Sequence, residues 1–110
     1  MSYIPDRGDF VMTDFDPQAG HEQAGPRPAL VLSQKLYNSP SGLAICCPIT
    51  SRQKGYPFEV LLPSNLSVYG VVLVDQIKSL DWSARPFAFL GKAPAPVLQD
   101  VLEKLNTLLS

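Results

Sequence analysis

The chain has 110 residues, of which 45% are apolar, and a net charge of −1, which indicates one globular domain over residues 1–110 rather than a disordered segment. No apolar run reaches the length of a membrane span and nothing resembling a signal sequence opens the chain, so we expect a cytoplasmic protein that engages no membrane. The two cysteines, Cys46 and Cys47, are adjacent in an apolar run, which excludes a CxxC metal site and favours buried thiols.

Short strands and polar loops are predicted for the first half of the chain. Residues 9–15 (DFVMTDF) mix β-branched and aromatic residues and predict a first strand. Residues 16–28 contain two glycines and three prolines, which is typical of a loop. A loop of this length in a small domain is usually functional or mobile. The next elements are a strand at 29–33, a turn at 39–42 and a strand at 43–49.

The second half continues this pattern and ends differently. We expect a polar loop at 50–57, a strand at 58–62, a long strand or a bent pair of strands at 70–80, a turn at 81–86 and a strand at 87–91. From Pro96 onward, apolar residues recur at spacings of three and four, which predicts an amphipathic helix. The chain is therefore expected to be mostly β with a C-terminal helix, as a small barrel or sandwich.

The charge is distributed unevenly along the chain. Residues 1–26 hold one arginine against five carboxylates, whereas residues 27–92 hold seven cations against three carboxylates. The cationic middle can build a basic face for nucleic acid that the total charge conceals. Ordinary scatter of surface charge explains the same numbers, and charge alone favours that second explanation.

Candidate catalytic residues are few. His21 is the single histidine, and no P-loop, GxSxG or HExxH motif is present. If the loops at 16–28 and 50–57 open on one edge of the barrel, Glu22, Arg27 and Thr50 meet, with Lys54 nearby. An arginine that clamps phosphate, a hydroxyl that donates to it and a carboxylate that accepts a proton suit phosphodiester chemistry. RNA supplies its own 2′-hydroxyl nucleophile, so no metal or cofactor is expected. The alternative is a loop ion pair of Glu22 with Arg27 and a turn hydroxyl at Thr50.

The same residues lie within a longer series of motifs. In chain order these are PDRGDFV, TDFDP, GHEQAGPRPALVLS, YN at 37–38, CPIT at 47–50, KGYPFEV at 54–60 and VLVDQIKSLDW at 72–82. By the order and spacing of these motifs, the chain resembles the MazF/PemK toxin family over nearly its whole length.

The resemblance implies a homodimer of small SH3-like β-barrels (CcdB/MazF-like). It implies an mRNA interferase that cleaves single-stranded RNA at a short sequence without metal and leaves a 2′,3′-cyclic phosphate and a 5′-hydroxyl. The family's essential arginine and threonine correspond to Arg27 and Thr50, and its loop glutamate corresponds to Glu22. Because arginine seldom releases a proton, we expect Arg27 to stabilise charge and Glu22 or a water to take the 2′-hydroxyl proton. The implied partner is a cognate MazE-like antitoxin whose acidic segment covers the RNA groove.

Further residues are candidates for contact with RNA. Lys54, Lys78 and Arg52 can meet phosphates, and Gln76 can bond a base edge. Asp14 or Asp16 can accept from an exocyclic amine. Three aromatic residues can stack on bases, although core or dimer-interface roles are more common for such residues: Phe15, Tyr56 and Trp82.

Two other functions remain alternatives on the same scaffold. One is a toxin that poisons DNA gyrase, as the related CcdB toxins do, against which the intact EQAGPRP loop with Thr50 argues. The other is an SH3-like module that binds a peptide without cleaving RNA.

Overall fold

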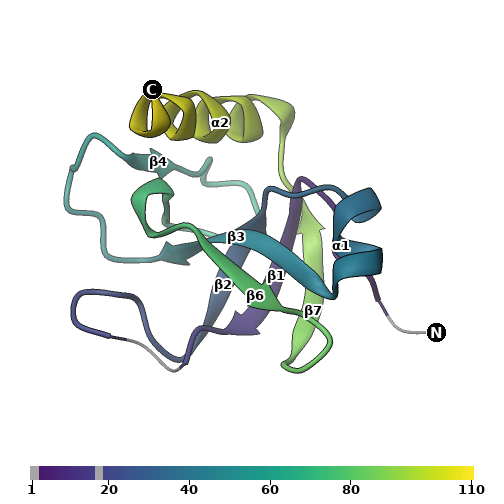
Figure 1. Ribbon diagram of the computed structural model, residues 1–110. Coiled ribbons are helices and arrows are strands. Elements are labelled where there is room, and N and C mark those ends of the chain that lie inside the picture. The colour runs from purple at the N-terminus through teal and green to yellow at the C-terminus, as the bar shows by residue number, and fades with distance from the viewer. Residues whose placement is uncertain (1–2, 17–18) are drawn as a thin grey trace.

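The computed structural model describes residues 3–16 and 19–110 and shows a strongly bent antiparallel sheet with one long helix across it (Figure 1). The elements are β1 (Asp9–Asp14), β2 (Pro26–Val31), α1 (Lys35–Ser41), β3 (Leu43–Thr50), β4 (Glu59–Leu61), β5 (Val71–Leu73), a short 3₁₀ helix η1 (Val74–Gln76), β6 (Lys78–Asp81), β7 (Phe87–Lys92) and α2 (Ala95–Leu109). The expected mostly β fold with a C-terminal helix is confirmed.

Strand β3 is the centre of the sheet. One of its edges pairs with β2, while its other edge pairs with β6 along its first half and with β5 at its end. The path of pairs runs β4-β5-β3-β2-β1-β7, and within residues 3–16 and 19–110 no pair joins β4 to β7, so the barrel is open there. The segment predicted as a long strand or a bent pair is the bent pair, because η1 interrupts the chain between β5 and β6.

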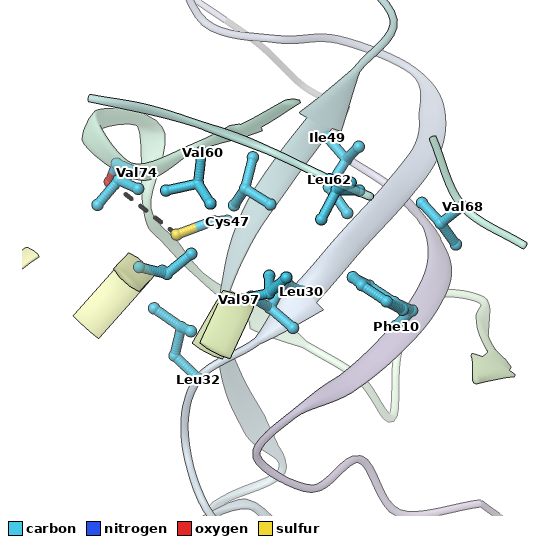
Figure 2. Close-up of a cluster of buried hydrophobic side chains, with 12 residues drawn as sticks. Phe10, Leu30, Leu32, Cys47, Ile49, Val60, Leu62, Val68, Val74 and Val97 are labelled. Atoms are coloured by element: carbon cyan, nitrogen blue, oxygen red, sulfur yellow. Dashed lines mark hydrogen bonds between the residues drawn. The ribbon is translucent and has the colours of Figure 1, made fainter. Parts of the chain in front are cut away.

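Alternating side chains along the strands form two apolar layers. Phe10, Leu30 and Cys47 lie on the face covered by α2, which adds Val97 and Val101 to the cluster shown in Figure 2. Burial raises the pKa of Cys47 to about 12, and its Sγ donates to the carbonyl of Val74 over 3.9 Å, so the thiol stays neutral. Neither helix of the described chain is long and apolar enough to cross a membrane.

The second layer lies on the opposite face of the sheet. It contains Val11, Ala29, Val31 and Cys46, all fully buried. The prediction that both cysteines are buried thiols is therefore confirmed.

Two local predictions were wrong. The expected turn at 39–42 is the last part of helix α1, which ends where Gly42 adopts a left-handed φ of +73°. The buried side-chain amide of Asn38 anchors this helix to the rest of the fold, because it donates to the carbonyls of Pro5 and Ser33. The expected loop at 16–28 ends early, because β2 already begins at Pro26.

Candidate active site

The sheet splits between β2 and β3 at the positions of Arg27 and Thr50. Pairing of the two strands ends at Ala29 and Pro48, and the same register continued by two residues sets Arg27 opposite Thr50. Pro28 and Pro48 have no N–H to donate, which limits the ladder at this point. Thr50 instead pairs with β5 on the other edge of β3. An opening therefore separates two strands that are neighbours elsewhere.

A cavity of about 960 Å³ lies at this opening. Arg27 and Thr50 both line it, so the structure brings together two of the three expected catalytic residues. The described part of the loop before β2 and the loop after β3 project from the same side of the sheet (Figure 1, left), which is the condition under which the sequence brings these residues together. The second of these loops adds the cations Arg52 and Lys54 to the lining, together with Tyr56.

Arg27 is oriented by the backbone of its own loop. Its Nε and Nη2 donate to the carbonyl of Ala24 over 3.2 and 3.0 Å. Its other N–H groups have no partner among the residues that the structure describes, and so they are available to an anion. Partial burial lowers the pKa of Arg27, yet a guanidinium keeps its charge in proteins.

The hydroxyl of Thr50 donates to no acceptor among residues 3–16 and 19–110. Its Oγ1 accepts the backbone N–H of Arg52 over 3.2 Å, which leaves the hydroxyl proton available for donation to a ligand. The loop beyond it is held by Glu59, whose carboxylate accepts the backbone N–H groups of Lys54 and Gly55. This loop therefore has a defined shape at the rim of the cavity.

Glu22 lies beside the cavity rather than in its lining. It lines an adjoining cavity of about 300 Å³ with Lys78. Its Oε1 accepts the backbone N–H of Ala19 over 2.9 Å and pairs with Lys78 Nζ at 3.2 Å. The bond from Ala19 and the nearby ammonium lower the pKa of Glu22. The alternative that Glu22 forms an ion pair with Arg27 is therefore wrong.

Gln76 lies between the two cavities and lines both. Its Oε1 accepts the backbone N–H of Gln23 over 2.8 Å, which ties the first loop to η1. His21, Gln23 and Asp75 also line both cavities, so the two cavities adjoin along these residues. Gln76 thus lines the same cavity as Arg27 and Thr50, and its contact with RNA stays a prediction.

The structure places Asp14 and Asp16 outside both cavities. Asp14 accepts the N–H of Asp16, and Asp16 accepts the N–H of Gly25 across the neck of the first loop. Arg85 donates to the backbone carbonyls of both residues. These bonds shape the base of the loop.

Of the three aromatic candidates for stacking, only Tyr56 lines the larger cavity. Phe15 is 1% exposed in the core, and the indole of Trp82 donates to the carbonyl of Asn38. Tyr69, which the sequence patterns did not single out, also lines the cavity. The sequence offered one indication of its position, because Tyr69 directly precedes Gly70, the first residue of the strand predicted at 70–80.

Comparison with known proteins identifies the family of this chain. Residues 6–109 match the family described as the PemK-like, MazF-like toxin of type II toxin–antitoxin systems. The Endoribonuclease toxin MazF of Escherichia coli K12 is 48% identical over 107 residues, covering 97% of this chain and 96% of that protein. The crystal structure of MazF from Deinococcus radiodurans superposes with a TM-score of 0.95 at 57% identity and covers 98% of both chains. A MazE-MazF crystal structure from Deinococcus radiodurans has a TM-score of 0.87 at 50% identity and covers 99% of this chain and 98% of that one. The chain therefore belongs to the PemK-like, MazF-like toxin family.

Proposed function

We propose that this MazF-like endoribonuclease cleaves single-stranded RNA by attack of the 2′-hydroxyl on the adjacent phosphorus, without a metal ion. The new bond joins O2′ to phosphorus, the bond from phosphorus to O5′ breaks, and the leaving O5′ takes a proton from water, which balances the proton lost by the 2′-hydroxyl. The products are a 2′,3′-cyclic phosphate and a 5′-hydroxyl. The observation that carries the proposal is that Arg27 and Thr50, from separate strands, line one cavity at the split in the sheet.

Each of the two side chains has a role in this reaction. Negative charge grows on the non-bridging phosphate oxygens as the 2′-oxygen attacks. The N–H groups of Arg27 that Ala24 does not use and the hydroxyl of Thr50 donate to those oxygens. Arg52 and Lys54 are the cations for the neighbouring phosphates of an extended strand.

Proton transfer from the 2′-hydroxyl is assigned to Glu22 or to a water. In the observed arrangement the carboxylate of Glu22 is bonded to Ala19 and Lys78. Its lowered pKa keeps it ionised and makes it a weaker base. Glu22 therefore acts as the base only after its bond to Lys78 opens, whereas a water needs no such movement.

The proposal extends to partners and assembly. Structural neighbours of this chain include MazE-MazF complexes, so we propose a MazE-like antitoxin as its partner. An acidic antitoxin segment complements the cations Arg27, Arg52 and Lys54 at the cavity. The chain is proposed to act as one domain, paired in a cytoplasmic homodimer.

The test is cleavage of a long unstructured RNA in EDTA. The wild type is expected to give discrete fragments that share one short sequence at their ends. Arg27→Ala and Thr50→Ala are each expected to lower kcat/KM by about 10² to 10³, because each removes a donor to the developing charge. Their circular dichroism spectra are expected to match that of the wild type.

Lys35→Ala is the matched control, since it removes an exposed cation on α1, outside the cavity lining. It is expected to cut at the wild-type rate. Wild-type rates for both Arg27→Ala and Thr50→Ala would show that the active site has been assigned to the wrong residues.

A further inference from the structure

Two large aromatic side chains stand exposed around the candidate active site. Tyr69 is 72% exposed and Tyr56 is 60% exposed, and both line the cavity that holds Arg27 and Thr50. Lys54 Nζ lies 6.0 Å from the centre of the Tyr56 ring, so an ammonium already approaches that ring. Neither tyrosine hydroxyl is needed by the chemistry proposed above.

The backbone fixes Tyr69 beside Thr50. The next residue, Gly70, has a φ of +114°, and a Cβ placed on it would lie 2.2 Å from the carbonyl oxygen of Thr50. The preceding residue, Val68, is 3% exposed in the core. Tyr69 is therefore held between a buried side chain and a close backbone contact, and it lines the cavity with an exposed side chain. Fixed backbone next to a catalytic group suits the positioning of a substrate.

Resting on the proposed function, we propose that Tyr69 positions RNA by stacking its ring on an unpaired nucleobase next to the scissile phosphate. A phosphate held by Arg27 and Thr50 puts the flanking bases within the same cavity, where the ring offers an apolar face. Aromatic rings beside cations are the usual platform for single-stranded nucleic acid. The cations at this cavity, Arg52 among them, favour the RNA strand over an apolar protein surface as the occupant.

The test uses a short oligonucleotide that binds the protein and is made uncleavable by 2′-deoxy sugars. The fluorescent base 2-aminopurine replaces each nucleotide in turn, because stacking quenches its emission. With the wild type we expect quenching at a position next to the scissile link. Tyr69→Phe is expected to keep both the quenching and the Kd, whereas Tyr69→Ala loses the quenching and raises the Kd about tenfold or more. Tyr37→Ala is the matched control, since Tyr37 is 44% exposed on α1 and outside the cavity lining.

The outcomes separate this proposal from the proposed function. If RNA is cut normally and Tyr69→Ala binds and quenches like the wild type, the stacking role is overturned and the nuclease stands. If the wild type quenches 2-aminopurine through Tyr69 but cuts no RNA, the stacking role stands and the nuclease fails. If Tyr69→Ala weakens only the binding of the antitoxin, the ring belongs to a protein interface and the proposal is overturned.

Discussion

Gly70 is a single residue whose lack of a side chain shapes the rim of the cavity. A Cβ at this position would meet the carbonyl carbon of Thr50 at 2.8 Å as well as its oxygen at 2.2 Å. Both contacts are to backbone in the β3–β5 ladder, so neither atom can move aside easily. Tight approach of the two backbones is what brings the chain at Tyr69 close to the backbone of Thr50.

Gly70→Ala is accordingly expected to destabilise the protein and to disturb the site. The positive φ alone costs an alanine about 1–3 kcal/mol, and the clash with Thr50 adds to this. Urea unfolding of the variant measures the loss. Gly55→Ala is the matched control, because Gly55 also has a positive φ of +79° but nothing lies within 4 Å of its Cβ position. Equal stability of the two variants would show that close packing against Thr50 is not what requires the glycine.

The catalytic residues differ in how far the sequence alone could place them. Arg27 and Thr50 lie at the ends of strands that follow one another, and antiparallel pairing of such strands brings those ends together. Glu22 lies in a loop, and its partner Lys78 is 56 residues away, so only the folded loop decides which cation it meets. Tyr69 was missed because the exposure of its side chain depends on the path of the folded chain. Tyrosine as a residue type occurs both in cores and on surfaces, so the sequence does not show which applies.

The first loop is held against η1 and β6 by two contacts from its described part. Gln23 donates its N–H to Gln76, and the carboxylate of Glu22 joins the N–H of Ala19 to the ammonium of Lys78. Since the bond from Ala19 is the largest cause of the lowered Glu22 pKa, the amide of Ala19 reports the protonation of that carboxylate.

A pH titration of the Ala19 amide by NMR tests this arrangement. Because the folded-state pKa of Glu22 is lowered, the contact is fully present above the ordinary glutamate pKa and is lost as the pH falls through the lowered value. The expected midpoint therefore lies below about 4.3, the usual value for glutamate. Lys78→Met removes both the hydrogen bond and the charge by which Lys78 lowers this pKa, and it is expected to move the midpoint upward. A midpoint that Lys78→Met leaves unchanged would exclude the ion pair in solution.

The secondary-structure elements were predictable where apolar periodicity was strong. The C-terminal helix and the central strands follow directly from that periodicity. Helix α1 was missed because it has seven residues and contains Pro40, which normally ends a helix. The start of β2 was missed because Pro26 and Pro28 suggest a loop. These prolines are accommodated because, within the part of the chain that the structure describes, this stretch of β2 pairs with β1 alone and faces the split in the sheet on its other edge.

Across the whole protein, the net charge of −1 conceals a difference between the negative and the positive side chains in what they contact. Carboxylates of the first segment already have partners within the protein, since Asp9 is buried and pairs with Lys92, and the more exposed Asp6 accepts the N–H of Lys35. By contrast, Arg52 and Lys54 form no ion pair with any carboxylate among the described residues. The free cations of the cavity, rather than the total charge, are thus expected to govern attraction of RNA.

The salt dependence of RNA binding measures how local this attraction is. Each phosphate contact with a single strand contributes about 0.7 to the slope of log Kd against log salt concentration. Arg52→Gln and Lys54→Gln are each expected to lower the slope by about that amount, because each removes one contact at the cavity. Lys35→Gln removes the same charge from α1, outside the cavity, and is expected to leave the slope unchanged. If Lys35→Gln lowered the slope as much as Lys54→Gln, RNA would be held by diffuse surface charge, and the cavity would lose its role in binding.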